Sequence, residues 1–281
     1  MKHVFMAPLA AVIVLGMIFT GCEALNGPLE GLEKVFKGES GGEAPLPETA
    51  TANNVKNILK LTKNDKTQSL RALTLIKDSL AGADPADRAA LQTAAVQSAL
   101  NATGLFETIL NGGGGAIDGL ISGEEGDPDR LGGVLDSLLT LPNNKEASPL
   151  IIASLSDVAA GDDAQANFIA QADKDKRPTA DEVALAGLTV IFGDEDLATS
   201  SGATTAEKLE TYIKKIATDN PGVAAPDFDD PDSVTQYINE LDALGTVPEN
   251  FIVGLGLINV ARQMGGGMIT DLLAESVSDA F

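Results

Sequence analysis

Residues 251–261 of the chain read FIVGLGLINVA, which is the most apolar run beyond the first 22 residues. These residues are too few to span a bilayer, since a membrane helix needs about 20. The run is apolar on nearly every side of a helix, which is typical of a helix buried in the core or in a groove shared with a partner. We expect the first arrangement, a core helix over residues 249–263.

Helical periodicity extends from that run over most of the chain. Toward the N-terminal side, apolar residues recur every third or fourth position, as at Val55, Ile58 and Leu59 and again at Leu70, Leu73, Ile76 and Leu80. This spacing places them on one face of a helix. Few segments alternate apolar and polar residues as a strand would. The low aromatic content, 4%, also favours helices over strands.

Capping residues mark seven helix starts. In four of them an Asp or Ser precedes a proline at the first helical position, where its missing N–H is no loss: Asp84-Pro85, Asp127-Pro128, Ser148-Pro149 and Asp230-Pro231. Three others have capping-box spacing: Thr179-x-x-Glu182, Thr204-x-x-Glu207 and Thr246-x-x-Glu249. Together these starts predict an all-α fold.

The predicted helices cover residues 54–81, 85–102, 104–110, 129–141, 149–160, 163–172, 180–192, 205–218, 231–244, 249–263 and 267–279. Their lengths and short connections favour antiparallel helix pairs stacked on one another, as an irregular helical array or bundle. The arrangement loosely resembles tetratricopeptide or HEAT-type arrays. No repeat of fixed period supports a closer likeness.

The first 22 residues have the pattern of an export signal. Met1, Lys2 and His3 precede an apolar run at 4–19, and Thr20-Gly21-Cys22 follows it. A positive end, an apolar core and small residues are typical of a secretory signal peptide. The run is shorter than a membrane-spanning helix, which favours a removable leader over residues 1–21.

Phe19-Thr20-Gly21-Cys22 resembles the lipobox of bacterial lipoproteins, in which a bulky apolar residue and two small residues precede a cysteine. In that family the cysteine is diacylated and the chain is cut before it. The resemblance implies lipidation of Cys22, the only cysteine, and a cell-envelope location in which the acyl chains bind the membrane. By analogy with enteric bacteria, Glu23 favours the outer over the inner membrane. The alternative is an ordinary signal peptide, or an uncleaved helix, with a chance cysteine.

The lipidated segment is expected to continue as a tether. Residues 22–52 are rich in Gly, Glu and Pro, which predicts a flexible spacer. The all-helical domain is then expected to cover residues 53–281.

Composition limits the possible chemistry. The formal net charge of −22 opposes binding to nucleic acid and to anionic lipid headgroups. His3 and Cys22 are the only histidine and cysteine, so the chain after Cys22 lacks the groups for serine–histidine or cysteine–histidine catalysis, Cys/His zinc sites and disulfides. The sequence therefore predicts no catalytic residues, no metal site and no cofactor.

Loops rich in glycine or acid offer weaker signals. The glycine-rich segments are 111–115 and 265–267, and the acidic segments are 173–182, 193–196 and 227–232. The glycine-rich segments lack the Gly-Lys-Ser/Thr ending of a phosphate-binding loop, and we interpret them as helix connectors. In 173–182, Pro178 replaces the glycine that a calcium loop needs at its sharp turn. We interpret the acidic segments as solvated loops with helix-capping carboxylates.

The sequence is compatible with three functions. The first is a lipid-anchored envelope protein that binds or scaffolds other envelope proteins. The second is a carrier that holds an apolar ligand between its helices, which requires an internal cavity. The third is a carboxylate-based hydrolase, which requires two buried acids about 5 to 10 Å apart in one cleft.

Overall fold

The computed structural model describes residues 45–105, 141, 143–202, 204–228 and 230–267, and the compact unit that they form begins at Leu46. Over these residues the secondary structure consists of ten α-helices and no β-strand, so the prediction of an all-α fold is confirmed. The helices are α2 (Val55–Thr62), α3 (Lys66–Leu80), α4 (Pro85–Thr103), α8 (Asn144–Ala160), α9 (Asp162–Asp175), α10 (Ala180–Phe192), α11 (Glu195–Thr199), α12 (Thr205–Asp219), α13 (Pro231–Leu244) and α14 (Glu249–Gln263). Within the described ranges, no helix is both long enough and apolar enough to cross a membrane.

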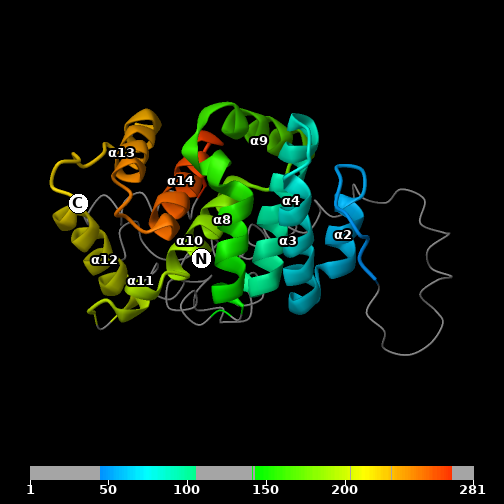
Figure 1. The fold of residues 1–281 in the computed structure, drawn as a ribbon, viewed down its shortest axis with the longest axis horizontal. Coiled ribbons are helices and arrows are strands. Elements are labelled where there is room, and N and C mark those ends of the chain that lie inside the picture. The colour runs from blue at the N-terminus through cyan, green and yellow to red at the C-terminus, as the bar shows by residue number, and fades with distance from the viewer. Residues whose placement is uncertain (1–44, 106–140, 142, 203, 229, 268–281) are drawn as a thin grey trace, which may run out of the picture. The chain divides into compact units, whose positions relative to one another are not determined.

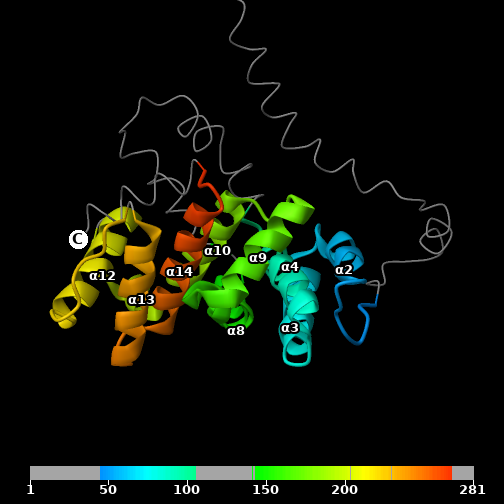
Figure 2. The same ribbon diagram turned by 90° about the horizontal axis from the view of Figure 1, so that it is seen from above.

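The helices of the compact unit lie side by side in a row (Figure 1). Helices α2, α3 and α4 form one end, α8, α9, α10 and α14 the middle, and α11, α12 and α13 the other end, as the view from above also shows (Figure 2). Contacts between α4 and α8 fix their relative direction. Arg88 binds Asp157 at 3.0 Å, whereas Ala102 accepts a hydrogen bond from Asn143 at 3.0 Å. The N-terminal part of α4 thus contacts the C-terminal part of α8, and the two helices are antiparallel.

Helix α14 is the central core helix that the run at 251–261 predicts. Residues 253–261 are all buried, and three neighbouring helices cover them. Gly254 lies against the backbone of α10, and Gly256 lies against the backbone of Ala159 in α8. The amide of Asn259 donates to the Pro231 carbonyl and the Thr235 hydroxyl of α13, both at 3.0 Å. An all-round apolar surface is therefore matched by neighbours on three sides.

Local capping chemistry places several helix ends where the sequence predicts them. Asp84 and Asp230 accept backbone N–H groups of the first turn, and Thr179 and Thr204 form complete capping boxes. The bounds of three helices agree with the predicted ranges: 180–192, 231–244 and 249–263. The starts at Pro85, Ala180, Thr205 and Pro231 are fixed by residues within one turn of the cap.

The predicted single helix over 54–81 is wrong, because the chain forms two helices there, α2 and α3. Asp65 separates them. Its backbone is extended, with φ −134° and ψ 109°, and its side chain accepts the N–H of Gln68 at 2.9 Å. An aspartate in this position offers the backbone an alternative to continuing the helix.

The predicted helix start at Ser148-Pro149 is also wrong, since α8 begins at Asn144 and Pro149 lies inside it. Ala147 and Ser148 are 0% and 1% exposed, and the Ser148 hydroxyl donates to the Val190 carbonyl at 3.3 Å. Burial of this first turn outweighs the backbone hydrogen bond that proline removes.

The predicted capping box at Thr246 is wrong as well, although α14 begins at Glu249 as expected. Pro248 occupies the N-cap position, and no side chain caps the helix. The Thr246 hydroxyl instead donates to the Asn220 amide oxygen at 3.2 Å. The short helix α11 is absent from the predicted elements, and Asp194 caps it.

The core begins before the first helix. Ala50 is 4% exposed, its N–H donates to the Ser79 hydroxyl at 2.9 Å, and Leu46 packs against the same core. Several predicted features lie outside the described residues: the leader, most of the tether, the helices at 129–141 and 267–279, most of the helix at 104–110, the start at Asp127-Pro128 and the glycine-rich segment 111–115.

Candidate functional site

Two carboxylates are buried among the described residues, and they lie at opposite ends of α10. Glu182 is 4% exposed in the first turn, and Asp194 is 9% exposed just after the last turn. At a helical rise of about 1.5 Å per residue, the two positions are roughly 18 Å apart along the helix axis. This distance exceeds the spacing of a glycosidase pair, about 5 to 10 Å. The two buried acids therefore do not form such a pair.

Glu182 has a structural role. One of its carboxylate oxygens accepts the Thr179 N–H at 2.7 Å and completes the capping box of α10. The other oxygen binds the Arg177 guanidinium. Both oxygens are thus occupied by partners from the same loop.

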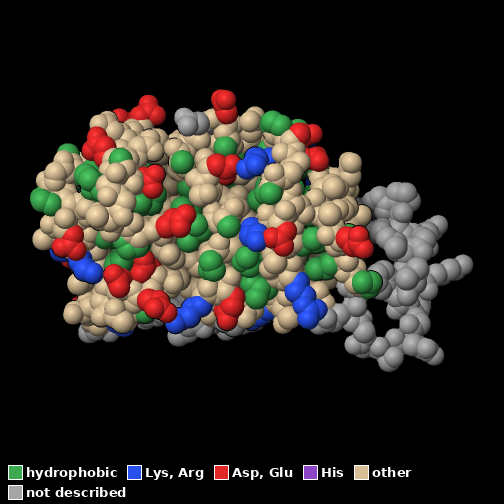
Figure 3. Space-filling model, in the orientation of Figure 1, with side chains coloured by type: hydrophobic (Ala, Val, Ile, Leu, Met, Phe, Trp, Pro, Cys, Tyr) green, Lys and Arg blue, Asp and Glu red, His purple; other side chains and the backbone are tan. Residues whose placement is uncertain are grey.

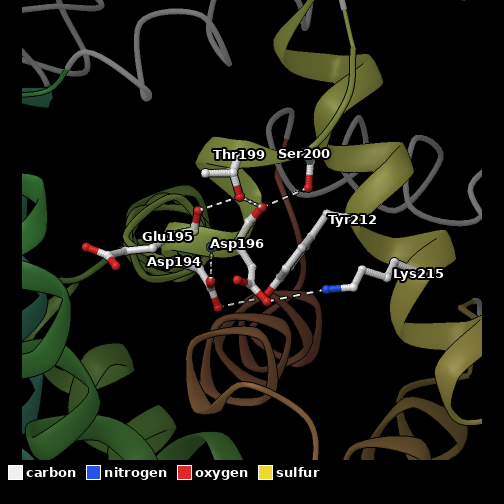
Figure 4. A network of polar contacts seen from close by, with 7 residues as sticks. All are labelled: Asp194, Glu195, Asp196, Thr199, Ser200, Tyr212 and Lys215. Carbon is white, nitrogen blue, oxygen red and sulfur yellow. Dashed lines mark hydrogen bonds and ion pairs between the residues drawn. The ribbon is translucent and has the colours of Figure 1, made fainter.

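Asp194 connects α11 to α12 (Figure 4). Its Oδ1 accepts the N–H of Asp196 at 2.8 Å, which caps α11, and its Oδ2 accepts the Tyr212 hydroxyl at 2.8 Å. The Tyr212 ring is 1% exposed and packs edge-to-face on Phe251, with centroids 5.9 Å apart and planes at 75°. A single carboxylate therefore orders the junction between α11, α12 and the first turn of α14.

Charged groups extend from this junction to the surface. The Lys215 ammonium lies 3.4 Å from the Asp196 carboxylate, and both side chains are more than half exposed. The hydroxyls of Thr199 and Ser200 donate to the Asp196 carbonyl at 3.1 and 2.9 Å and close the short helix α11 (Figure 4). Asp196 thus holds α11 in place with its backbone and faces Lys215 with its side chain.

A depression of about 260 Å³ lies beside the junction. Its lining comes from α11, α12 and the segment before α14: Asp196, Tyr212, Lys215, Ile216, Asp219, Asn220, Thr246, Val247 and Pro248. Small-molecule sites usually hold about 300 to 1,000 Å³, so the depression is too small to enclose a typical ligand. Buried Ile216 and Val247 lie beside exposed Asp219. This combination suits one long basic side chain, whose aliphatic stem packs on apolar atoms while its cation meets a carboxylate.

The two tyrosines of the chain are weaker acids than a free tyrosine. Burial raises the pKa of Tyr212 far above its usual 10.0, and the hydrogen bond to Asp194 and the nearby negative charges raise it further. Burial raises the pKa of Tyr237 to about 12. Both phenols therefore stay neutral at physiological pH, and Tyr212 acts as a hydrogen-bond donor.

These raised pKa values predict alkaline unfolding. A phenol whose pKa is raised by folding stabilises the folded state below its unfolded pKa of 10.0, and this stabilisation is lost as pH rises toward the folded value. We expect stability to decline between pH 10 and about 12, with cooperative ionisation of both tyrosines. Tyrosinate absorbance and circular dichroism, followed together, check this prediction.

A Tyr212→Phe variant provides the control, because it leaves Tyr237 as the only tyrosine and, without Trp in the chain, the only ultraviolet reporter of this kind. Its absorbance should still rise only near pH 12 or with unfolding. Ionisation of either tyrosine near pH 10, with circular dichroism unchanged, would contradict the burial described above.

The acidic segments act as caps and ion-pair partners. In 173–182, Asp175 binds the Lys56 ammonium at 2.8 Å and the Gln171 amide at 2.6 Å. Partial burial raises the pKa of Asp175, but these hydrogen bonds and the charges of Lys56 and Lys174 outweigh it and lower the pKa below its usual value. Over the described residues, no three acidic, cysteine or histidine side chains are grouped to hold a metal ion.

The four residues of the predicted lipobox are not part of this site. Cys22, Phe19, Thr20 and Gly21 lie outside the described residues. Asp194, inside the acidic segment 193–196, is a helix cap as expected, but its bond to Tyr212 was not predicted. The signal for that bond was weak. A tyrosine on the apolar face of a predicted helix indicates burial, and a buried hydroxyl needs a partner.

Comparisons of the chain with protein-family models, with curated proteins and with solved structures found no match.

Proposed function

We propose that the protein is a lipid-anchored component of a bacterial cell envelope that binds or scaffolds other envelope proteins. One observation carries the proposal. The only cysteine of the chain, Cys22, lies after the apolar run 4–19 and directly follows Phe19-Thr20-Gly21. Two or three acyl chains on this residue hold a protein on a membrane far more firmly than one. Glu23 after the cysteine favours the outer membrane.

The depression beside α12 supports a binding role for the helical body. Its volume suits a side chain of a partner, and the exposed carboxylate of Asp219 lines it, whereas Asp196 already faces Lys215. The net charge of −22 favours a partner with a basic surface, since complementary charges speed encounter and select against acidic competitors. We therefore place the partner contact at this depression and expect a lysine or arginine to occupy it.

The two alternative functions have less support. An apolar ligand carrier needs space between helices, but α10 and α14 approach so closely that a methyl group at Gly187 would lie 2.6 Å from the Gly254 carbonyl. A carboxylate-based hydrolase needs paired buried acids, but Glu182 and Asp194 lie at opposite ends of α10. Neither requirement is met at these positions.

Lipidation is tested by the intact mass of protein extracted from membranes of a bacterium that processes lipoproteins. We expect loss of residues 1–21 and the added mass of two or three acyl chains. A Cys22→Ala variant should carry no acyl mass and should leave the membrane fraction. An unmodified full-length chain would overturn the anchor.

The partner contact is tested by crosslinking in the native envelope, followed by identification of the captured proteins. An Asp219→Lys variant should lose the main crosslinked partner, because it places a positive charge where a basic side chain is expected. Asp78→Lys provides a matched reversal at an exposed position in the last turn of α3, away from the depression, and should retain the partner. Equal capture by both variants would overturn the assignment of the contact to this depression.

A further inference from the structure

Helix α2 presents a lysine-rich side to solvent. Its buried side is formed by Val55, Ile58 and Thr62. Lys56, Lys60 and Lys63 are all exposed, and their spacing of four and three residues aligns them in one stripe. Leu61, which lies about 100° or more around the helix from each of these lysines, is 43% exposed and is one of only two large hydrophobic side chains so exposed among the described residues.

This side of α2 differs in charge from the rest of the protein. Residues 49–64 contain three lysines and no acidic residue, whereas the whole chain has a net charge of −22. Acidic side chains are spread over the face of the molecule shown in Figure 3. Lys56 is paired with Asp175, whereas Lys60 and Lys63 have no ion pair with any residue in the part of the chain that the structure describes. The lysine-rich side is therefore a local positive surface on an acidic protein.

The position of α2 in the chain links this surface to the proposed anchor. α2 is the first helix of the compact unit and lies at one end of the row of helices (Figures 1 and 2). The compact unit begins at Leu46, 24 residues after Cys22. A flexible spacer of that length, as the sequence predicts for this segment, has a mean span of about 25–30 Å. A membrane-held Cys22 thus keeps α2 at high effective concentration near the lipid headgroups.

We propose that the lysine-rich side of α2 rests on the anionic headgroups of the membrane that holds the anchor and so orients the helical body. The inference rests on the lipid anchor proposed above. Each lysine near an anionic surface strengthens contact about fivefold. At physiological salt, charges farther than about 8 Å are largely screened, so the acidic remainder does not cancel the local attraction.

Lysine acylation on vesicles tests the proposal. The lipidated protein, which begins at Cys22, is reconstituted on phosphatidylcholine vesicles, and on vesicles with an equal part of phosphatidylglycerol. Acylation rates are then read by mass spectrometry. We expect the acylation rates of Lys60 and Lys63 to be lower on the anionic vesicles than on the neutral ones, by a factor of about five or more. Lys145 and Lys214, whose side chains are 77% and 56% exposed elsewhere, should react equally on both and serve as internal controls.

A charge-removal variant separates orientation from anchoring. In Lys60→Gln/Lys63→Gln, Lys56 should be acylated at the same rate on both vesicle types. In the matched Lys145→Gln/Lys214→Gln variant, Lys56 should be acylated more slowly on the anionic vesicles than on the neutral ones. Both variants replace exposed side chains, and circular dichroism checks that both remain helical. Equal acylation of Lys60 and Lys63 on the two vesicle types, with the protein still floating with both, would overturn this inference alone. Failure to float with neutral vesicles would overturn the anchor and this inference with it.

Discussion

Replacing Phe251 by alanine is expected to lower the free energy of unfolding by about 3–5 kcal/mol. The ring is 1% exposed in the first turn of α14 and contacts Tyr212 edge-to-face. Truncation removes apolar contacts and leaves a cavity at the junction of α11, α12 and α14, where the Asp194 hydrogen bonds restrict collapse. Chemical denaturation followed by circular dichroism measures the loss.

Leu244→Ala provides the matched control for Phe251→Ala. Leu244 is the last residue of α13 and is 47% exposed, so its truncation should change stability by less than about 0.5 kcal/mol. A loss below about 1 kcal/mol for Phe251→Ala would mean that the ring is not part of the core. A similar loss in both variants would contradict the contrast in burial between the two positions.

Replacing Gly254 by valine is expected to cost about 3 kcal/mol. A Cβ at Gly254 would overlap the Ile191 side chain and lie 2.7 Å from the Gly187 carbonyl oxygen. A side chain has some freedom to rotate away, but a backbone carbonyl inside a helix does not, so α10 and α14 have to separate. The helix propensities of valine and glycine differ by well under 1 kcal/mol, so steric overlap dominates the effect.

Gly222→Val tests whether the cost at Gly254 comes from the contact rather than from the loss of a glycine. Gly222 has no atom within 4 Å of a built Cβ, so valine there should be nearly neutral. Gly187→Val should resemble Gly254→Val, because a Cβ at Gly187 would lie 2.6 Å from the Gly254 carbonyl. The double variant should cost less than the sum, since one separation of the helices relieves both overlaps. Strict additivity would argue against a shared contact.

Some features of the fold follow from local chemistry alone. Asp84, Thr179 and Thr204 begin their helices as predicted, since a cap and the N–H groups it satisfies lie within four residues of each other. The run at 251–261 predicts its own burial, since a helix that is apolar on all sides has no surface suited to water. The anchor at Cys22 is likewise a prediction from contiguous residues.

Other features depend on residues far apart in the chain. α8 extends through Ser148-Pro149 because contacts with α10 bury its first turn. The Thr246 hydroxyl donates to the Asn220 side chain and does not cap α14. The depression exists only because α11, α12 and the segment before α14 meet around Asp194 and Tyr212.

The sequence by itself therefore determined that the body is all-α, where most helices begin, and which helix lies at its centre. Each of these depends on the spacing of apolar residues and on hydrogen bonds within one helical turn. The tertiary structure decided which helices pair, which caps yield to burial, and which two acids, Glu182 and Asp194, are buried. Those outcomes depend on the free energy of packing between distant segments, which no local pattern records.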